Sequence, residues 1–480
     1  MIFASPIFLF LFLPVFLVCY YLTPQRFRSA VILLGSTVFY AWWRVDFVAL
    51  LYAIILWNWL VALGIEKKQN SGNSKGLLAL GVIVNLLALG YFKYWNFGVN
   101  SFFAIFMPAG SRPPAGLADV LLPIGISFFV FHGISYIVDV YRRDTPATKN
   151  LFDFAAFITL FPHLIAGPVL RYKDLAWQFK NRRHGFDVFS EGALRFMLGF
   201  AKKVLIADTV APLADAAFAL ENPTMADAWL GCFAYAVQLY FDFSGYSEMA
   251  VGLALMMGFR FIENFNFPYI SRSITEFWRR WHISLSTWLR DYLYIPLGGS
   301  KKGEVRTYIN LFLTMLLGGL WHGANWTFVL WGAWHGGLLA IERLAGVKAD
   351  DKLSGVPGAL RWAYTLLAVL LGWVAFRAPD MQSAFAFYRG MAGLNGMGIS
   401  AGLDWQIKGT ALCALAGGIL VVAAQPFFAK YRKPVMLSKE SVAMETVMPL
   451  WQQLAVGALF IAAVSRLLAM SYSPFLYFQF

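Results

Sequence analysis

Apolar runs separated by short charged segments dominate this 480-residue chain. Runs that reach or approach the length of a membrane-spanning helix, about 20 residues, lie near residues 6–22, 29–43, 46–65, 76–93, 121–140, 190–220, 226–257, 307–341, 358–377, 409–427 and 451–470. They predict an all-α, polytopic helical membrane protein with about 11 transmembrane helices plus re-entrant or interfacial helices. We expect a single membrane domain over residues 1–480, with N-terminal spans in 1–140, a core that holds the interfacial helices and the candidate site in 141–345, and C-terminal spans in 346–480.

Basic residues set the expected orientation of the early spans. Arg26 and Arg28 follow the first apolar run, and no basic residue precedes it. The positive-inside rule therefore places the N-terminus outside. Between Asn96 and Ala118 the chain contains Pro, Gly and a single basic residue, Arg112, which predicts an external loop.

Residues 151–169 do not fit a simple crossing. They are mostly apolar but contain Pro162, His163 and Gly167, and a basic run from Arg171 to Arg183 follows them. A complete crossing would place that run outside, against the positive-inside rule. We therefore expect a re-entrant or interfacial segment.

The stretch 264–306 mixes aromatic and basic residues. Ser273, with Glu276 three residues later, matches a capping box and predicts the start of a helix. The apolar side of that helix is expected to carry Trp278, Trp281, Leu285, Trp288 and Leu289. Charges at 279, 280, 290 and 291 make a complete crossing expensive, at about 2.5 to 3.5 kcal/mol each near the bilayer centre. We expect a helix that lies at the interface or dips into the protein and brings His282 toward the site.

The stretch from Thr307 to Ile341 has no Asp, Glu, Lys or Arg, yet it contains two His, two Asn, four Trp and six Gly. At 35 residues it is too long for one straight span, which predicts a bent or broken helix near Gly323. Irregular backbone at bilayer depth needs protein or water to satisfy its polar groups. His322 is therefore a candidate for chemistry, or alternatively a core histidine bonded to a carbonyl or to Asn325. The surrounding glycines could admit a substrate or only permit close helix contacts.

The other histidines carry weaker signals. His335 lies 13 residues after His322, which on one helix means about 20 Å of rise and about 220° of rotation, so only a break could bring the two together. His282 could line a passage or bind Glu276 or a backbone group. We expect non-catalytic roles for three more histidines: His132 and His163 in the core, and His184 in solvent.

Composition narrows the class of protein. Hydrophobic residues make up 59% of the chain and charged residues 14%, against about 25% charged in soluble domains. Basic cytoplasmic loops alone explain the net charge of +13, so this charge does not require a nucleic-acid partner. The three cysteines form no C-x-x-C pair, and no histidine set has zinc spacing, so neither a disulfide framework nor a metal site is indicated.

Several motifs resemble those of the membrane-bound O-acyltransferase family, in its bacterial polysaccharide branch. The matching segments run along nearly the whole chain: Tyr40-Ala41-Trp42-Trp43, Gly90-Tyr91-Phe92-Lys93-Tyr94, Leu122-Pro123-Ile124-Gly125, Pro162-His163-Leu164-Ile165-Ala166-Gly167-Pro168, Gln238-Leu239-Tyr240-Phe241-Asp242-Phe243-Ser244-Gly245, Phe277-Trp278-Arg279-Arg280-Trp281-His282 and Leu320-Trp321-His322-Gly323. The Trp- and Arg-rich motif followed by Trp-His-Gly is the most specific.

The resemblance implies an O-acetyltransferase of the bacterial inner membrane with a central tunnel. It would move acetyl groups from a cytoplasmic donor, acetyl-CoA, toward an exopolysaccharide, with alginate favoured over cellulose or peptidoglycan. Periplasmic acetyltransferase-like partner proteins, membrane lipid and no tightly bound cofactor or metal are implied as well. His322 matches the catalytic histidine and His282 a second histidine near the tunnel, while Asp242 and Asn310 are candidates for a further polar role. The basic run at 171–183, with Lys202 and Lys203, could meet a coenzyme A phosphate on the cytoplasmic side, although simple positive-inside bias explains it more readily.

Two other classes of function stay open on the sequence. A transporter of an acyl carrier would favour similarly interrupted helices in both halves, whereas the Trp-His-Gly interruption occurs only in the C-terminal half. A non-catalytic scaffold that recruits periplasmic enzymes is the other alternative. Thioester hydrolysis by the purified protein would separate both from an enzyme.

Overall fold

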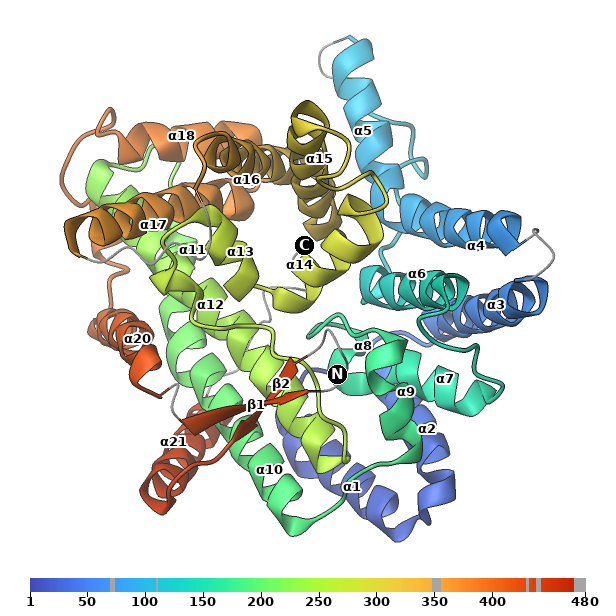
Figure 1. The fold of residues 1–480 in the computed structure, drawn as a ribbon. Coiled ribbons are helices and arrows are strands. Elements are labelled where there is room, and N and C mark those ends of the chain that lie inside the picture. Colours follow the sequence, from blue (N-terminus) through green and yellow to red (C-terminus); the bar gives the residue numbers. More distant parts are fainter. Residues whose placement is uncertain (70–73, 109–110, 348–354, 429–430, 437–441, 470–480) are drawn as a thin grey trace. The chain divides into compact units, whose positions relative to one another are not determined.

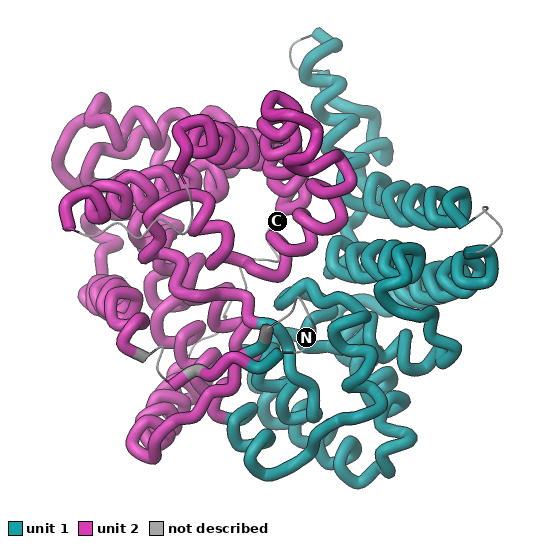
Figure 2. The backbone as a smooth tube through the Cα atoms, viewed as in Figure 1, with its two compact units in different colours: residues 1–193, 250–262, 435–443 teal, residues 194–249, 263–434, 444–480 magenta. Residues whose placement is uncertain are grey.

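The computed structural model describes residues 1–69, 74–108, 111–347, 355–428, 431–436 and 442–469. The chain divides into two compact units: residues 1–193, 250–262 and 435–443 form unit 1, and residues 194–249, 263–434 and 444–480 form unit 2 (Figure 2). Both are mostly helical (Figure 1). Helices α10 (Phe186–Ala201) and α12 (Met225–Met256) each run from one unit into the other.

The helices of unit 1 follow the predicted apolar runs. They are η1 (Phe8–Phe12), α1 (Leu13–Leu22), η2 (Gln25–Phe27), α2 (Arg28–Ala41), α3 (Asp46–Lys68), α4 (Ser74–Leu89), η3 (Gly90–Tyr94), α5 (Trp95–Phe106), α6 (Ile126–Arg142), α7 (Leu151–Thr159), α8 (Phe161–Leu164) and α9 (Tyr172–Lys180). The prediction of a loop from Asn96 onward was wrong for its first part, because an apolar, uncharged sequence continues the helix through α5. Residues Ser74–Phe106 form 33 residues of continuous helix.

Unit 2 holds the candidate site. Its elements are η4 (Lys202–Ala207), α11 (Asp208–Phe218), η5 (Pro268–Ile270), α13 (Ile274–Arg280), α14 (Ile283–Leu289), η6 (Arg290–Tyr294), α15 (Glu304–His322), α16 (Trp326–Leu344), α17 (Gly355–Arg377), α18 (Met381–Met391), α19 (Ala401–Asp404), α20 (Gly409–Phe428) and α21 (Leu450–Ala469). Strands β1 (Arg432–Met436) and β2 (Val442–Thr446) pair as a two-stranded sheet, a small departure from the expected all-α fold.

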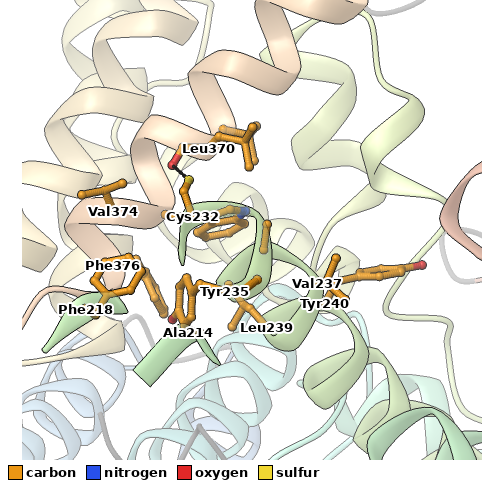
Figure 3. Close-up of a cluster of buried hydrophobic side chains, with 14 of the residues drawn as sticks. Ala214, Phe218, Cys232, Tyr235, Val237, Leu239, Tyr240, Leu370, Val374 and Phe376 are labelled. Atoms are coloured by element: carbon orange, nitrogen blue, oxygen red, sulfur yellow. Dashed lines mark hydrogen bonds between the residues drawn. The ribbon is translucent and has the colours of Figure 1, made fainter. Parts of the chain in front are cut away.

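The core of unit 2 is built where α11, α12 and α17 meet. Figure 3 shows Phe218, Tyr235 and Phe376 among its side chains, and the Cys232 thiol donates to the carbonyl of Leu370 at 3.4 Å. The Phe218 ring also stacks on Phe387 of α18, at a centroid distance of 4.1 Å. This aromatic packing gives α17, and Phe376 on it, a fixed position beside the site.

Five of the described helices are long and apolar enough to cross a membrane: Asp46–Lys68, Ser74–Phe106, Gly355–Arg377, Gly409–Phe427 and Leu450–Ala469. Many large apolar side chains on these helices are exposed, such as Leu87 at 66% and Leu420 at 69%. Exposed apolar surface of this extent is expected of a protein whose solvent is lipid. The membrane class predicted from composition therefore agrees with the fold.

Candidate active site

Helices α15 and α16 form a hairpin whose turn lies beside His322. Helix α15 ends at His322, and Gly323 follows in extended conformation. Asn325 then caps α16, because its side chain accepts a hydrogen bond from the backbone N–H of Thr327 at 3.2 Å. The predicted break near Gly323 is confirmed. The alternative in which Asn325 serves His322 is not supported, since its amide N–H₂ donates to the carbonyl of Pro379.

Glycines bring the two helices of the hairpin into close contact. A Cβ built on Gly319 would lie 2.3 Å from the carbonyl oxygen of Phe328, and one on Gly332 would lie 2.6 Å from that of Met315. A side chain at either position would force the helices apart. Gly318 instead lines a cavity, and the prediction that these glycines admit a substrate stays a prediction.

His322 forms part of the wall of that cavity. The cavity has a volume of about 210 Å³ and is lined by Trp278, Leu285, Ser286, Leu289, Arg290, Tyr294, Leu311, Thr314, Met315, Gly318, His322, Trp331 and Leu339. The imidazole is 7% exposed, and its ring centroid lies 5.2 Å from that of Trp331 and 5.1 Å from that of Phe376. Aromatic rings thus fix the imidazole while it still reaches a space large enough for part of a substrate.

His282 lies in a break of the segment that was predicted as one continuous helix. Ser273 caps α13 as predicted, with its hydroxyl accepting from the backbone N–H of Glu276 at 2.9 Å. The helix then stops at Arg280, and His282 adopts a left-handed conformation with φ 44° before α14 starts. The continuous helix was wrong because residues 264–266 pair with the backbone on both sides of the break, through Asn266 N–H to Arg280 O and Ile283 N–H to Asn264 O. A strained non-glycine residue held in this way is typical of functional sites.

Asn264 determines how the His282 ring is oriented. Its Oδ1 accepts from the Ser284 hydroxyl at 2.8 Å and from the Ser284 N–H at 3.3 Å, and it lies 3.2 Å from His282 Nδ1. An oxygen can only accept, so Nδ1 of the neutral ring carries the proton and Nε2 carries the lone pair. Burial lowers the pKa of His282 and favours that neutral form. The alternative in which His282 binds Glu276 is not supported, since Glu276 pairs with Arg280.

The two histidines selected from the sequence are neighbours in space. Their ring centroids lie 6.4 Å apart, and the indole of Trp321 lies next to both, at 5.0 Å from His322 and 6.2 Å from His282. Phe243 of α12 packs edge-on against His282 at 4.7 Å. Three chain segments far apart in sequence therefore converge on one imidazole pair.

His335 occupies a different environment. Its ring is fully buried among Trp278, Trp331 and Phe277, and neither ring nitrogen has a hydrogen-bond partner among the described residues. It does not line the cavity at His322. Both histidine rings contact the Trp331 ring, His322 at 5.2 Å and His335 at 5.1 Å, but of the two only His322 lines the cavity. This geometry gives His335 a packing role.

The remaining histidines lie in unit 1. His132 and His163 are buried and stacked at 4.5 Å, as expected of core residues, and His163 Nε2 donates to the carbonyl of Phe157. The expectation of a solvated His184 was wrong. Its Nε2 accepts from Arg28 at 2.9 Å and lies 3.1 Å from the Tyr20 hydroxyl.

The basic residues considered for phosphate binding are mostly engaged in the protein. Arg171 pairs with Asp174, and Arg182 donates to the Ser29 hydroxyl, with both guanidinium groups buried. Lys203 is buried between Asp208 and Asp242. These ion pairs make the basic run a structural feature of the fold, and they give Asp242 a structural partner in Lys203.

Three site residues were missed at the sequence level. Asn264 and Glu342 are polar residues whose partners lie 18 to 68 positions away, so no local pattern reveals them. The carboxylate of Glu342 accepts from the backbone N–H groups of Ile274 and Thr275, which anchors the first turn of α13. Trp331 lies in the uncharged stretch from Thr307 to Ile341, but no role was predicted for it. Its buried indole N–H beside His322 has no partner among the described residues.

Asn310, a candidate from the resemblance, instead donates to the carbonyl of Gly299.

Comparison with known proteins agrees with the resemblance found in the sequence motifs. Residues 139–376 match the model of the membrane-bound O-acyltransferase family. The chain is 54% identical to a probable alginate O-acetylase AlgI of Pseudomonas putida, with all of both chains covered. It is 37% identical to a peptidoglycan O-acetyltransferase of Helicobacter pylori, over 83% of this chain and 81% of the relative. It is also 29% identical to a teichoic acid D-alanyltransferase of Bacillus subtilis, over 66% of this chain and 80% of the relative.

Proposed function

Because the chain belongs to the membrane-bound O-acyltransferase family, we propose that it transfers acetyl groups from acetyl-CoA in the cytoplasm toward alginate outside the inner membrane. Identity of 54% over the full length of an alginate O-acetylase, against 37% over part of a peptidoglycan enzyme, favours alginate as the polymer. The chain would act as one membrane domain with about 11 crossings and a central tunnel, because donor and acceptor lie on opposite sides of about 30 Å of hydrocarbon. The immediate acceptor is a hydroxyl of the polymer or of a periplasmic partner protein.

The observation that supports this chemistry best is His322 in the wall of a cavity, with the buried ring of His282 6.4 Å from its own. In the proposed reaction, His322 removes the proton from the acceptor hydroxyl as its oxygen attacks the thioester carbonyl carbon. The new C–O bond forms, the C–S bond breaks, and the thiolate leaves as coenzyme A and takes up the proton. A positioned general base contributes typically about 10² to 10⁴ in rate.

His282 and Trp331 support the same step. With Nδ1–H held at Asn264, the His282 lone pair lies on Nε2, where it can orient the acceptor or pass on a proton. The Trp331 indole N–H is a donor already desolvated beside His322, and it suits the oxyanion of the tetrahedral intermediate. The backbone N–H of Gly323 is less suitable, because it donates to the carbonyl of Gly319.

Substitution of His322 tests the proposal. His322→Ala and His322→Gln should lower alginate acetylation by at least about 10² in a host without its own enzyme, with normal amounts of protein in the membrane. His335→Ala is the matched control, because it removes a buried imidazole from the adjacent helix that does not line the cavity. Purified protein should also consume acetyl-CoA. Near-normal acetylation by His322→Ala would remove His322 as the base and leave His282 as the next candidate.

A further inference from the structure

A second, larger cavity in unit 2 borders on Asn264. It has a volume of about 360 Å³, in the range of small-ligand sites. Residues of α10, α12, α20 and α21 form most of its wall, and none of its lining residues lines the cavity at His322. Asn264 connects it to the candidate active site, because the same side chain holds the ring of His282 through Oδ1.

One side of this cavity, here called its mouth, is lined by exposed apolar side chains of two candidate membrane spans. Val421 of α20 and Trp451 and Leu459 of α21 line it and are 40%, 60% and 46% exposed. Both helices are long and apolar enough to cross a bilayer. In a membrane their exposed apolar side chains face lipid, so the molecules at this mouth are lipid acyl chains.

Three residues that line this cavity carry hydrogen-bonding groups without a partner in the described part of the chain. The amide nitrogens of Asn264 and Gln452 and the hydroxyl of Ser244 are buried, and these atoms have no hydrogen-bond partner within the described residues. Buried polar groups are normally hydrogen-bonded, and two amide N–H₂ groups require an acceptor oxygen.

The charges in the wall argue for a neutral acceptor. Lys202 lies 3.6 Å from Glu248, and the Glu263 carboxylate lies 2.7 Å from Arg195. Each cation is thus neutralised by a carboxylate, so no uncompensated positive charge from these pairs would attract a phosphate to this part of the wall. An ester carbonyl has the required oxygen without a charge, and it is attached to an apolar chain of the kind the mouth accepts.

Much of this wall lies outside the part of the chain that matches the family model. That match ends at residue 376, whereas α20 and α21 begin at Gly409 and Leu450. The cavity therefore depends on C-terminal helices that the family model does not cover.

We propose that this cavity binds one acyl chain of a bilayer phospholipid, whose ester carbonyl oxygen accepts hydrogen bonds from the amides of Asn264 and Gln452. The lipid then contacts the residue that orients His282. Lipid binding does not depend on the acyl-transfer proposal, and it is measured separately from acetylation.

Titration of delipidated full-length protein with defined lipids tests this site. Native mass spectrometry would count bound molecules of ester-linked phosphatidylglycerol and of its ether-linked analogue, which has the same chains and headgroup but no carbonyl. We expect one tightly bound ester lipid and about fivefold weaker binding of the ether lipid, the effect of one lost hydrogen bond. Gln452→Met should weaken ester binding by about the same factor and reduce the difference between the two lipids.

A matched pair of substitutions on α21 locates the binding. Ala455 lines the cavity and Ala458 does not, although both are exposed on the same helix. Ala455→Trp should block the mouth and weaken binding by at least about tenfold, whereas Ala458→Trp should bind as the unmodified protein does. Equal affinity for the ester and ether lipids, unchanged binding by Ala455→Trp, or retention of detergent alone would overturn the proposal.

Discussion

Removing the acceptor oxygen of Asn264 should impair acetyl transfer without preventing folding. Leucine has nearly the same size as asparagine but leaves His282 Nδ1–H and the Ser284 N–H and hydroxyl without their common acceptor, whose present distances are 3.2, 3.3 and 2.8 Å. A buried donor left unsatisfied costs about 1 to 3 kcal/mol. The His282 ring can avoid this cost by rotating or by changing its tautomer. The reactive orientation is then less favourable by the same free energy, and the rate of acetyl transfer falls by about 5- to 150-fold.

The assay is the rate of acetyl transfer per amount of membrane protein, at several concentrations of acetyl-CoA. Asn264→Leu should lower kcat and leave the KM for the donor unchanged, because Asn264 does not line the cavity at His322. Ser284→Ala is the control, since it removes one hydrogen bond from the same oxygen but leaves the bond to His282. It should retain kcat within about threefold. Normal kcat in Asn264→Leu, or equal loss in Ser284→Ala, would show that the bond to His282 does not matter for transfer.

Three further predictions follow from individual contacts. The two carboxylate oxygens of Glu342 each accept one backbone N–H of α13, at 2.6 and 3.0 Å, and Glu342→Gln replaces one of these oxygens by an NH₂ group. It should destabilise the protein by about 1 to 3 kcal/mol, measured as a lower Tm in detergent, and an unchanged Tm would contradict the anchoring role. Trp331→Phe keeps an aromatic ring but removes the indole N–H, and it should lower kcat by about 10² to 10³ with little change in KM. A normal kcat would show that another group stabilises the oxyanion. Burial and the nearby Arg28 and Arg182 lower the pKa of His184, so the folded protein favours the neutral imidazole. The unfolded chain binds a proton at His184 once the pH falls below its pKa of about 6.5, and the folded protein loses stability relative to it. His184→Gln should therefore reduce the loss of Tm between about pH 7 and pH 5, and an identical pH dependence of Tm would contradict this explanation.

Local signals in the sequence were sufficient for several features of the fold and site. The hydrophobic runs predicted most helices, because burial in lipid or protein acts on each residue of a run independently. The capping box at Ser273 and the helix break beside Gly323 depend only on a few neighbouring residues. His322 was selected by the uncharged stretch around it and by the family motifs, and His282 by those motifs and its expected interfacial helix. The structure brings their rings within 6.4 Å.

Other features were decided only when distant segments met. The break at His282 depends on residues 264–266, which pair with the backbone around it, and the tautomer of its ring depends on Asn264. Glu342 anchors α13 from 68 positions away, and the basic run at 171–183 gains buried partners that its charge pattern does not reveal. Hydrophobic periodicity indicates which residues face a core, but it does not indicate which polar group a side chain will contact there. Hydrogen bonds and ion pairs need atoms within about 3 Å of each other, and only the tertiary structure determines which atoms those are.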